Sequence, residues 1–308
     1  MRVRVLGAAA GGGFPQWNTN SEACRRARRG DPGARSATQA SIAVSVDGRR
    51  WVLVNAAPDL RQQIEANPCL QPSEAIRSSP IAAVVLTNAD VDAVAGLLHL
   101  REGTPFALYA HERVLDVLDR NPIFEVVARA IVPRRELRVE EPVELMDADS
   151  DALGLRLTAF LAPGKVPLYL EGSTARNLDT AALTGDTLGL EIAVEGGRLV
   201  YLANCARVTD PLRQRIAGAE LLFMDGTLWR DDEMILQGVG SKTGGRMGHI
   251  SMSGPDGAIE RLRDVPIGRR VFIHVNNTNP ALLADSAERA ELARAGWEVA
   301  HDGMELSL

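Results

Sequence analysis

The stretch from Ile81 to Leu98, IAAVVLTNADVDAVAGLL, constrains the fold of this chain more than any other. Its first six residues are apolar and have the length of a buried β-strand. The strand pattern stops at Thr87 and Asn88, and two carboxylates, Asp90 and Asp92, precede an apolar segment typical of a helix start. Carboxylates in a loop after a strand are common metal ligands, but this loop contains no histidine. We therefore predict a strand, a metal-binding type of loop and a helix.

The composition favours a large globular protein that does not bind nucleic acid. With 308 residues, of which 45% are hydrophobic and 24% charged, the chain can bury a large core. A net charge of -6 opposes binding to phosphate backbones, which rests on clustered positive charge. Five arginines between Arg25 and Arg35 are a local exception. This segment is either a solvated loop or an anion-binding patch.

The sequence carries no sign of a membrane span or an export signal. No apolar run reaches the ~20 residues that cross a bilayer, and the N-terminal residues MRVRVLGAAAGGG lack the apolar core of a signal peptide. We therefore expect a cytoplasmic protein without membrane contact. Three cysteines, Cys24, Cys69 and Cys205, are widely spaced and odd in number, which predicts free thiols. The patterns leave a homodimer open.

Strand patterns recur along the chain, with helices between some of them. Asp47-Gly48 joins strands expected at residues 41–46 and 50–54 as a hairpin, and a helix follows at 60–66. The other expected strands cover residues 2–6, 81–86, 106–110, 155–160, 188–194, 199–202, 221–224, 271–275 and 297–300, and further helices cover 112–118 and 280–295. Strands in runs predict an α/β fold in which packed sheets are covered by helices. Neither a repeat nor a linker divides the chain, so we expect one domain over residues 1–308.

Polar residues gather at the ends of these expected strands. In packed sheets such ends converge, so we expect the following residues to meet: Asn88, Asp90, Asp92, Lys165, Asn204, Cys205, Asp225, His249, His274, Asn276 and Asn277. Asp90 and Asp92 are candidate metal ligands, although carboxylates at a helix start also cap free N–H groups. The polar run from Asn276 to Asn279 fits an uncharged hydrogen-bonding wall for a planar polar ligand.

Five sequence blocks together resemble one known family. They read LGAAAGGGFPQWN near the start, APGKVPLYLE from Ala162, DGTLWRDDEMI from Asp225, KTGGRMGHISMSG from Lys242 and FIHVNNTNP from Phe272. This pattern is similar to the pyrroloquinoline quinone biosynthesis protein B (PqqB) family over essentially the whole chain. The resemblance implies a metallo-β-lactamase-like αββα sandwich, with two packed mixed β-sheets flanked by helices.

The resemblance implies one of two functions in making the redox cofactor pyrroloquinoline quinone (PQQ). The first is an iron-dependent hydroxylase that acts on the tyrosine-derived ring of a precursor built from Glu and Tyr. The second is a non-catalytic carrier that binds PQQ or its precursor and moves it toward the periplasm. A two-metal hydrolase is not expected, because Asn88 and Ala93 stand where the superfamily loop H-x-H-x-D-H has histidines.

The resemblance places iron(II) on two histidines and one carboxylate, but one of these positions is changed. Asp92 and His274 match the family's ligands, and Ala93 stands where its other histidine belongs. A methyl group cannot bind a metal, so iron would need another donor. The candidates to complete the set are His249, Asp90 and Asp225. With His249 as that donor, Asp92, His249 and His274 would carry the chemistry, whereas His249 is alternatively a hydrogen-bond donor to a metal ligand or to the substrate.

A second departure concerns a structural zinc site. In the family, cysteines of a C-x-C-x-x-C zinc site follow the PQWN block, and the matching residues here are Thr19, Ser21 and Cys24. Since two of three thiolates are missing, we expect no structural zinc. Changes at two separate sites favour a divergent homologue over a single incidental replacement.

A ligand with several carboxylates, such as PQQ or its precursor, needs cations in its binding site. Lys165 lies in a Pro-Gly-Lys-Val-Pro turn that could aim its ammonium group into the pocket. Arg207 and Arg246 are the other candidates. A surface or ion-pair role is the alternative for each of the three.

Overall fold

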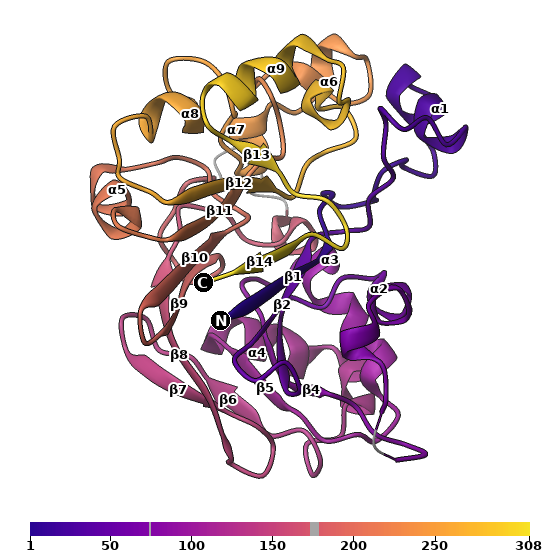
Figure 1. Cartoon of the computed structure of the whole chain (residues 1–308), viewed down its shortest axis with the longest axis vertical. Helices are drawn as coiled ribbons and strands as arrows, with labels where there is room; N and C mark the ends of the chain where they lie inside the picture. The colour runs from indigo at the N-terminus through magenta and orange to yellow at the C-terminus, as the bar shows by residue number, and fades with distance from the viewer. Residues whose placement is uncertain (74, 173–178) are drawn as a thin grey trace.

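The apolar strand patterns produce two β-sheets that pack face to face (Figure 1). The computed structural model describes residues 1–73, 75–172 and 179–308. The first sheet has the order β14-β1-β2-β3-β4-β5-β6 and the second has the order β13-β12-β11-β10-β9-β8-β7. The strands of the first sheet are β1 (Arg2–Gly7), β2 (Ser41–Ser45), β3 (Trp51–Val54), β4 (Ile81–Val85), β5 (Ala107–Ala110), β6 (Arg134–Glu136) and β14 (Glu305–Ser307). The strands of the second sheet are β7 (Pro142–Met146), β8 (Ala152–Leu161), β9 (Leu188–Val194), β10 (Gly197–Leu202), β11 (Leu221–Asp225), β12 (Arg269–Ile273) and β13 (Glu298–Val299).

Short helices surround the sheets, and several of them cover the outer faces. They are α1 (Glu22–Arg28), α2 (Leu60–Ala66), α3 (Val91–Val94), α4 (Glu112–Arg120), α5 (Asp210–Ile216), α6 (Glu233–Leu236), α7 (Gly244–Met247), α8 (Ala258–Arg261) and α9 (Ala287–Arg294). In Figure 1, α6, α8 and α9 lie at the top of the molecule, α5 at its left side and α2 at its right side. The longest described α-helix, α4, has nine residues, and no described helix has the length and apolar character needed to cross a bilayer.

The main core lies between the two sheets. Val5 and Val54 of the first sheet share one fully buried cluster with Leu157, Tyr201 and Phe223 of the second. Two further clusters lie on the outer faces, one under α2, α3 and α4 and the other under α5, α8 and α9. These four layers confirm the αββα sandwich. Burial on both faces also explains why β4 is apolar at every position rather than alternating.

Parallel strands in both sheets direct several loops to one edge of the sandwich. In the first sheet β3, β4, β5 and β6 run parallel to one another. In the second sheet β10, β11, β12 and β13 do the same. Because the carboxyl ends of parallel strands meet at the same edge of a sheet, the polar residues that follow β4, β10, β11 and β12 come together there.

Most of the predicted elements are confirmed, and the helix expected at 280–295 is wrong as a single element. The segment begins with a 3₁₀ turn at Pro280–Leu282, and α9 starts only at Ala287. Ser286 caps α9, since its hydroxyl accepts a hydrogen bond from the Arg289 N–H at 3.0 Å. The short strands β6, β7 and β14 were not predicted, because none of them has a run of apolar residues.

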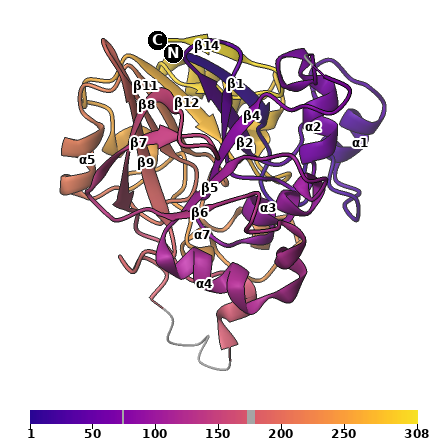
Figure 2. The ribbon, with the colours of Figure 1, turned by 90° about the horizontal axis from the view of Figure 1, so that it is seen from below.

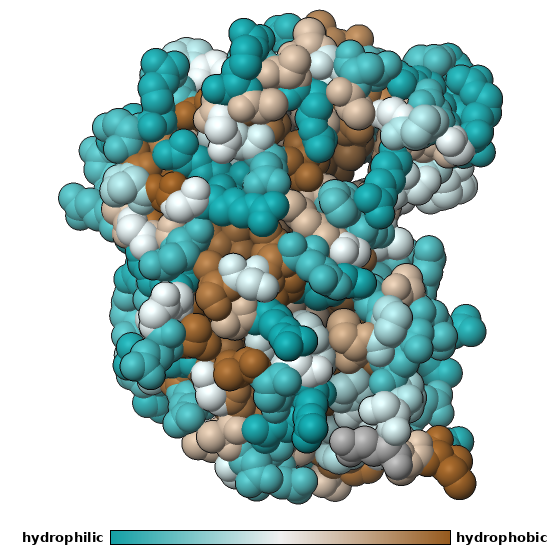
Figure 3. Space-filling model, in the orientation of Figure 1, coloured by the Kyte–Doolittle hydropathy of each residue, from teal (hydrophilic) through white to brown (hydrophobic). Residues whose placement is uncertain are grey.

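The two ends of the chain lie side by side, as Figures 1 and 2 show. The Met1 ammonium group donates a hydrogen bond to the Leu308 carbonyl oxygen at 2.6 Å, and β14 pairs with β1. The last strand therefore joins the first sheet, although β13 before it belongs to the second sheet. Hydrophilic residues cover most of the face in Figure 3, where the lobe that carries α1 stands out at the upper right.

Candidate functional site

A cavity of about 800 Å³ opens at the edge where the strand ends meet. Its walls come from the segment after β1, from the loops after β4, β8, β10, β11 and β12, and from α6 and α7. The predicted residues that line it are Asp90, Asp92, Lys165, Asn204, His249, His274, Asn276 and Asn277. The structure thus brings together residues that lie up to 187 positions apart in the chain.

Asp225 lies beneath this cavity and is fully buried. Its Oδ1 accepts hydrogen bonds from the Thr227 N–H at 3.0 Å and the Thr227 hydroxyl at 2.7 Å. Its Oδ2 accepts from the Cys205 N–H at 2.8 Å and from His249 Nδ1 at 2.7 Å. A carboxylate has about four acceptor sites, so Asp225 is fully occupied. It therefore orients the His249 ring and has no free oxygen for a metal.

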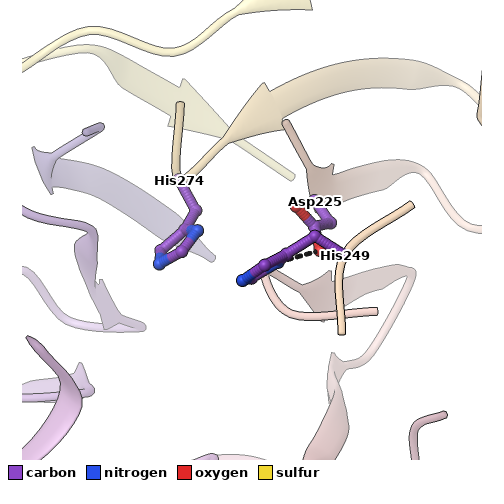
Figure 4. A group of neighbouring side chains, drawn as sticks. All are labelled: Asp225, His249 and His274. Carbon is purple, nitrogen blue, oxygen red and sulfur yellow. Dashed lines mark hydrogen bonds and ion pairs between the residues drawn. The ribbon is translucent and has the colours of Figure 1, made fainter. Parts of the chain in front are cut away.

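The Thr227 hydroxyl orients both histidines. It lies 3.0 Å from His249 Nδ1 and 2.9 Å from His274 Nδ1. This hydroxyl donates its single proton to Asp225, so it can only accept hydrogen bonds from the two imidazole rings. We therefore assign a proton to Nδ1 of each ring. The Nε2 atoms are then left as the metal-binding nitrogens. Figure 4 shows the two rings lying next to each other with the Asp225 carboxylate at His249, and their centroids are 5.3 Å apart.

Asp92 completes the site from the loop after β4. Its Oδ2 lies 3.1 Å from His274 Nε2. Burial tends to raise the pKa of the Asp92 carboxyl, but the hydrogen bond and charge of His274 bring it below its ordinary value. Burial tends to lower the pKa of His274, and Asp92 raises it above the ordinary value. Burial and the nearby Asp92 charge raise the pKa of Asp90, so the two carboxylates form a site that a cation would stabilise.

His274 adopts a backbone conformation that aids this arrangement. Its φ of 61° lies in the left-handed region, which is uncommon for a residue with a side chain and costs about 1–3 kcal/mol. The hydrogen bond to Thr227 holds the ring of this buried residue in place. The chain therefore leaves β12 in a sharp turn that points His274 at Asp92.

The side chains at this position include a group that could hold a metal ion. Asp225, His249 and His274 have ligand atoms that all lie within 4.8 Å of one another. The Nδ1 side of this group is occupied by the Thr227 hydroxyl and the Asp225 carboxylate. Among the described residues, no hydrogen bond uses His249 Nε2, and this residue lines the cavity. Because the Asp225 oxygens are already occupied, we infer that a metal would instead be held by the Nε2 atoms of His249 and His274 with the carboxylate of Asp92, which lies 3.1 Å from His274 Nε2.

Ala93 and Asn88 take no part in this set. Ala93 is buried in the apolar cluster under α3 and is outside the described lining of the cavity. Asn88 accepts the Asp90 N–H at 2.9 Å and donates to Asn204 Oδ1 at 3.2 Å. Its side chain therefore shapes the loop, which leaves Asp90 and Asp92 to face the cavity.

Comparison with known proteins gives the family of this chain. The model of the beta-lactamase superfamily domain matches residues 50–275. Coenzyme PQQ synthesis protein B of Gluconacetobacter diazotrophicus is 55% identical over 305 residues, which cover 98% of each chain, and that of Rhodopseudomonas palustris is 54% identical over 311 residues, which cover 100% of each. The chain belongs to the PqqB family. The crystal structure of zinc-bound PqqB from Methylobacterium extorquens has 52% sequence identity and a TM-score of 0.95, with 100% of both chains covered.

Of the three cationic side chains predicted to bind the ligand, one lines the cavity and two do not. Lys165 lines the cavity, and its Nζ lies 3.0 Å from Glu171 Oε1. Arg246 donates to Glu171 Oε2 at 3.0 Å and is outside the described lining. Arg207 is exposed and also outside it. The prediction missed Glu171 and Lys242, although both lie in the sequence blocks that indicated PqqB.

The polar wall after β12 is held by its own hydrogen bonds. Asn277 Nδ2 donates to Asn276 Oδ1 at 3.1 Å and also contacts Gln16 Oε1. Asn276 Nδ2 donates to the Thr278 hydroxyl at 2.6 Å, which in turn donates to Glu233 Oε1 at 2.6 Å. These bonds connect the wall to the segment after β1 and to α6, so the amides are positioned before a ligand binds.

The arginine-rich segment is helical in its first part, and most of its arginines are exposed. Its first residues belong to α1. Arg28 donates to the carbonyl oxygens of Thr19 at 2.7 Å and Gln16 at 2.6 Å. Arg25 donates to the Asn20 carbonyl at 2.7 Å. These arginines hold the loop of residues 16–21, which lines the cavity.

Two of the positions that correspond to the family's zinc cysteines have other roles in this loop. The Thr19 carbonyl is one acceptor of Arg28. The Ser21 hydroxyl accepts the Cys24 N–H at 3.3 Å and caps α1. Cys24 itself is buried as a free thiol. Backbone and side-chain hydrogen bonds thus order the segment.

We predict that Arg28→Ala loosens this loop. Two charge-assisted hydrogen bonds are lost, each worth about 1.5 kcal/mol. Hydrogen exchange measured on a peptide covering residues 16–24 should speed up by roughly tenfold. The matched control is Arg29→Ala, because Arg29 is exposed and contacts only Glu22, at 3.6 Å, among the described ion pairs. Equal exchange in the two variants would contradict the role of Arg28.

A second prediction concerns Gly96, which packs closely against the backbone of residues 56 and 57 behind the loop that carries Asp90 and Asp92. The Gly96 N–H donates to the Ala56 carbonyl at 2.8 Å, and the Ala56 N–H donates to the Ala93 carbonyl at 2.7 Å. A Cβ on residue 96 would lie 2.2 Å from the Ala57 carbonyl oxygen. Gly96→Ala should therefore lower the free energy of unfolding by about 2–3 kcal/mol in chemical denaturation.

The control for this prediction is Gly245→Ala in α7. A Cβ there would meet Asp231 Oδ1 at an ordinary 3.5 Å. Because alanine favours helices, this variant should be as stable as the original chain or more stable by up to about 1 kcal/mol. A loss for Gly245→Ala equal to that for Gly96→Ala would show that the steric argument is wrong.

Proposed function

We propose that this chain acts in PQQ synthesis as an iron(II)-dependent hydroxylase of the tyrosine-derived ring of a Glu-Tyr-derived precursor, in the cytoplasm. Membership of the PqqB family supports the pathway, because the full-length relatives are named coenzyme PQQ synthesis protein B. The observation that carries the reaction class is the donor set of Asp92, His249 and His274 at the cavity. Two histidines and one carboxylate with open positions are typical of non-haem iron(II) oxygenases.

Asp92, His249 and His274 would hold the iron. Bound iron(II) would supply the activation of dioxygen that ring hydroxylation requires. The protein's contribution is to keep each donor in its binding form. Asp225 and Thr227 hold a proton on Nδ1 of the histidines, so Nε2 is the nitrogen of each ring that would bind the metal. His274 Nε2 donates to Asp92 at 3.1 Å and would lose that proton when the metal binds.

The cavity suits a polar ligand of the size of PQQ or its precursor. Its volume of about 800 Å³ lies within the usual range for small-molecule sites. Asn204, Asn276 and Asn277 offer amide donors and acceptors along its wall. A planar ligand could therefore be held by hydrogen bonds along its edges while its ring lies beside the donor set.

A non-catalytic carrier of PQQ or its precursor is the second candidate. The hydrogen bonds that fix the wall run from Asn277 through Asn276 and Thr278 to Glu233 and do not involve the metal donors. The wall can therefore bind a ligand without metal, as a carrier that passes the quinone toward the periplasm would require.

Anaerobic loading with iron(II), followed by addition of precursor, oxygen and a reductant such as ascorbate, separates the two candidates. The hydroxylase predicts about one iron per chain and a product heavier by one oxygen atom per turnover, while the reductant supplies the two electrons that convert the other oxygen atom to water. If no stoichiometric iron binds while PQQ still does, the hydroxylase is wrong and the carrier is favoured. If iron binds but the precursor is recovered unchanged, the proposed reaction is also wrong.

A further inference from the structure

Lysine is nearly absent from this chain and is confined to the cavity. Only two of the 34 basic residues are lysines, and the others are arginines. Both lysines, Lys165 and Lys242, line the cavity. They also share one partner, since their Nζ atoms lie 3.0 and 3.9 Å from the two carboxylate oxygens of Glu171. A chain that uses arginine at its other basic side chains therefore has its lysine ammonium groups at one place only.

Glu171 is a buried carboxylate with several cationic partners. Glu171 is 6% exposed, and Arg246 contacts it at 3.0 Å in addition to the two lysines. Burial tends to raise the pKa of Glu171, but hydrogen bonds from Arg246 and Lys165 bring it below the ordinary value. Among the described residues, one carboxylate thus stands among three cations. Both lysines of this group line the cavity, which also contains the carboxylates of Asp90 and Asp92.

The chemistry of lysine explains why arginine would not serve here. An arginine in place of either lysine could pair with Glu171 through two parallel N–H groups. Those N–H groups would then not be free to bind a ligand. An ammonium group has three N–H donors. Lys165 uses two of them, on Glu171 and on the Val166 carbonyl at 3.2 Å. Lys242 has only the longer 3.9 Å contact with Glu171 among the described ion pairs, so its donors remain available to a ligand.

We propose that Lys165 and Lys242 form a subsite that binds the carboxylates of a planar polycarboxylate ligand, with Glu171 as the buried residue that holds the two ammonium groups together. This subsite shares no residue with the donor set of Asp92, His249 and His274. It rests on the proposed function for the identity of the ligand, PQQ or its precursor. It deepens that function because it names the cations that would hold the carboxylates of the ligand.

Lysine labelling tests the subsite directly, because the chain has only two lysines to follow. The protein is treated with an amine-acylating reagent, and the modification of Lys165 and Lys242 is measured by mass spectrometry. PQQ should protect both lysines, and the trimethyl ester of PQQ, which lacks the negative charges, should protect neither. Undiminished labelling of both lysines by a saturating concentration of PQQ would overturn the proposal.

Binding measurements on variants give a second test. Lys165→Met and Lys242→Met should each weaken PQQ binding by about 10- to 100-fold, the loss expected for a hydrogen bond to a charged group. Binding of the trimethyl ester should change by less than about twofold. The control is Arg263→Met, since Arg263 is exposed just after α8, pairs with Glu260 and is outside the described lining of the cavity. PQQ affinities that match this control in both lysine variants would show that the subsite is wrong.

One further experiment distinguishes failure of the subsite from failure of the proposed function. If the unaltered chain binds no PQQ, the proposed function is wrong, and the lysine pair is judged on benzene-1,3,5-tricarboxylate. Protection of both lysines by this anion and not by its trimethyl ester supports a carboxylate subsite for another ligand. Absence of protection overturns the subsite as well.

Discussion

His249→Ala is expected to weaken iron(II) binding by more than about 100-fold, although the residue at the family's usual ligand position is already Ala93. The reason is that, in the proposed donor set, His249 Nε2 takes the place of the missing imidazole. Removal of a residue that only supports a ligand typically costs 10- to 100-fold in metal affinity, and loss of a donor should exceed that. Anaerobic titration with iron(II) and a competing chelator measures the change.

The controls for this prediction use the other histidines. His274→Ala should weaken binding to a similar degree, because it removes the second imidazole. His99→Ala should leave it unchanged, since His99 Nε2 contacts the Pro58 carbonyl at 3.1 Å and the residue is outside the described lining of the main cavity. Iron affinity that survives in His249→Ala, with the fold intact by circular dichroism, would mean that the third donor is another group.

Asp225→Asn is expected to have the second large effect, on stability as well as on metal binding. An asparagine has one oxygen and one NH₂ group, whereas both oxygens of Asp225 accept hydrogen bonds. Whichever way the amide is turned, at least one buried donor, such as the Cys205 N–H, faces another donor. We expect a loss of about 2–4 kcal/mol in the free energy of unfolding.

The same substitution should weaken metal binding by about 10- to 100-fold, because the His249 ring loses the carboxylate that orients it. Denaturant unfolding and the iron titration measure the two effects separately. Asp232→Asn is the matched control, as Asp232 pairs with Arg230 on the surface at 2.8 Å. If Asp225→Asn keeps the stability and the affinity of this control, Asp225 does not hold the site together.

Most of the fold could be predicted because its strands are apolar on both faces. The segment at β4, with five buried residues in succession, is an example. Strands such as β14 could not be found, because they are short and stable only through pairing with distant residues of β1. The helix expected near the C-terminus was broken at residues 283–286, where local propensity gave no sign of the loop.

The sequence predicted which strand ends meet at the candidate site, but it could not predict what each side chain does there. Sequence spacing could not show that the four acceptor sites of Asp225 are all used inside the protein, since its donors come from Cys205, Thr227 and His249. For the same reason Asp225 and His249 could not be told apart as the group that would compensate for Ala93. The pairing of Lys165 with Lys242 also depended on the fold, because they are 77 residues apart.

The most direct test of the metal centre is the electron density of crystals loaded anaerobically with iron(II), measured with anomalous scattering at the iron edge. The proposed set predicts one iron peak about 2.0–2.2 Å from His249 Nε2, His274 Nε2 and a carboxylate oxygen of Asp92. Asp225 should keep its four hydrogen bonds and lie outside the coordination shell. An iron peak bound by Asp225, or one that leaves His249 Nε2 without a metal contact, would contradict the account.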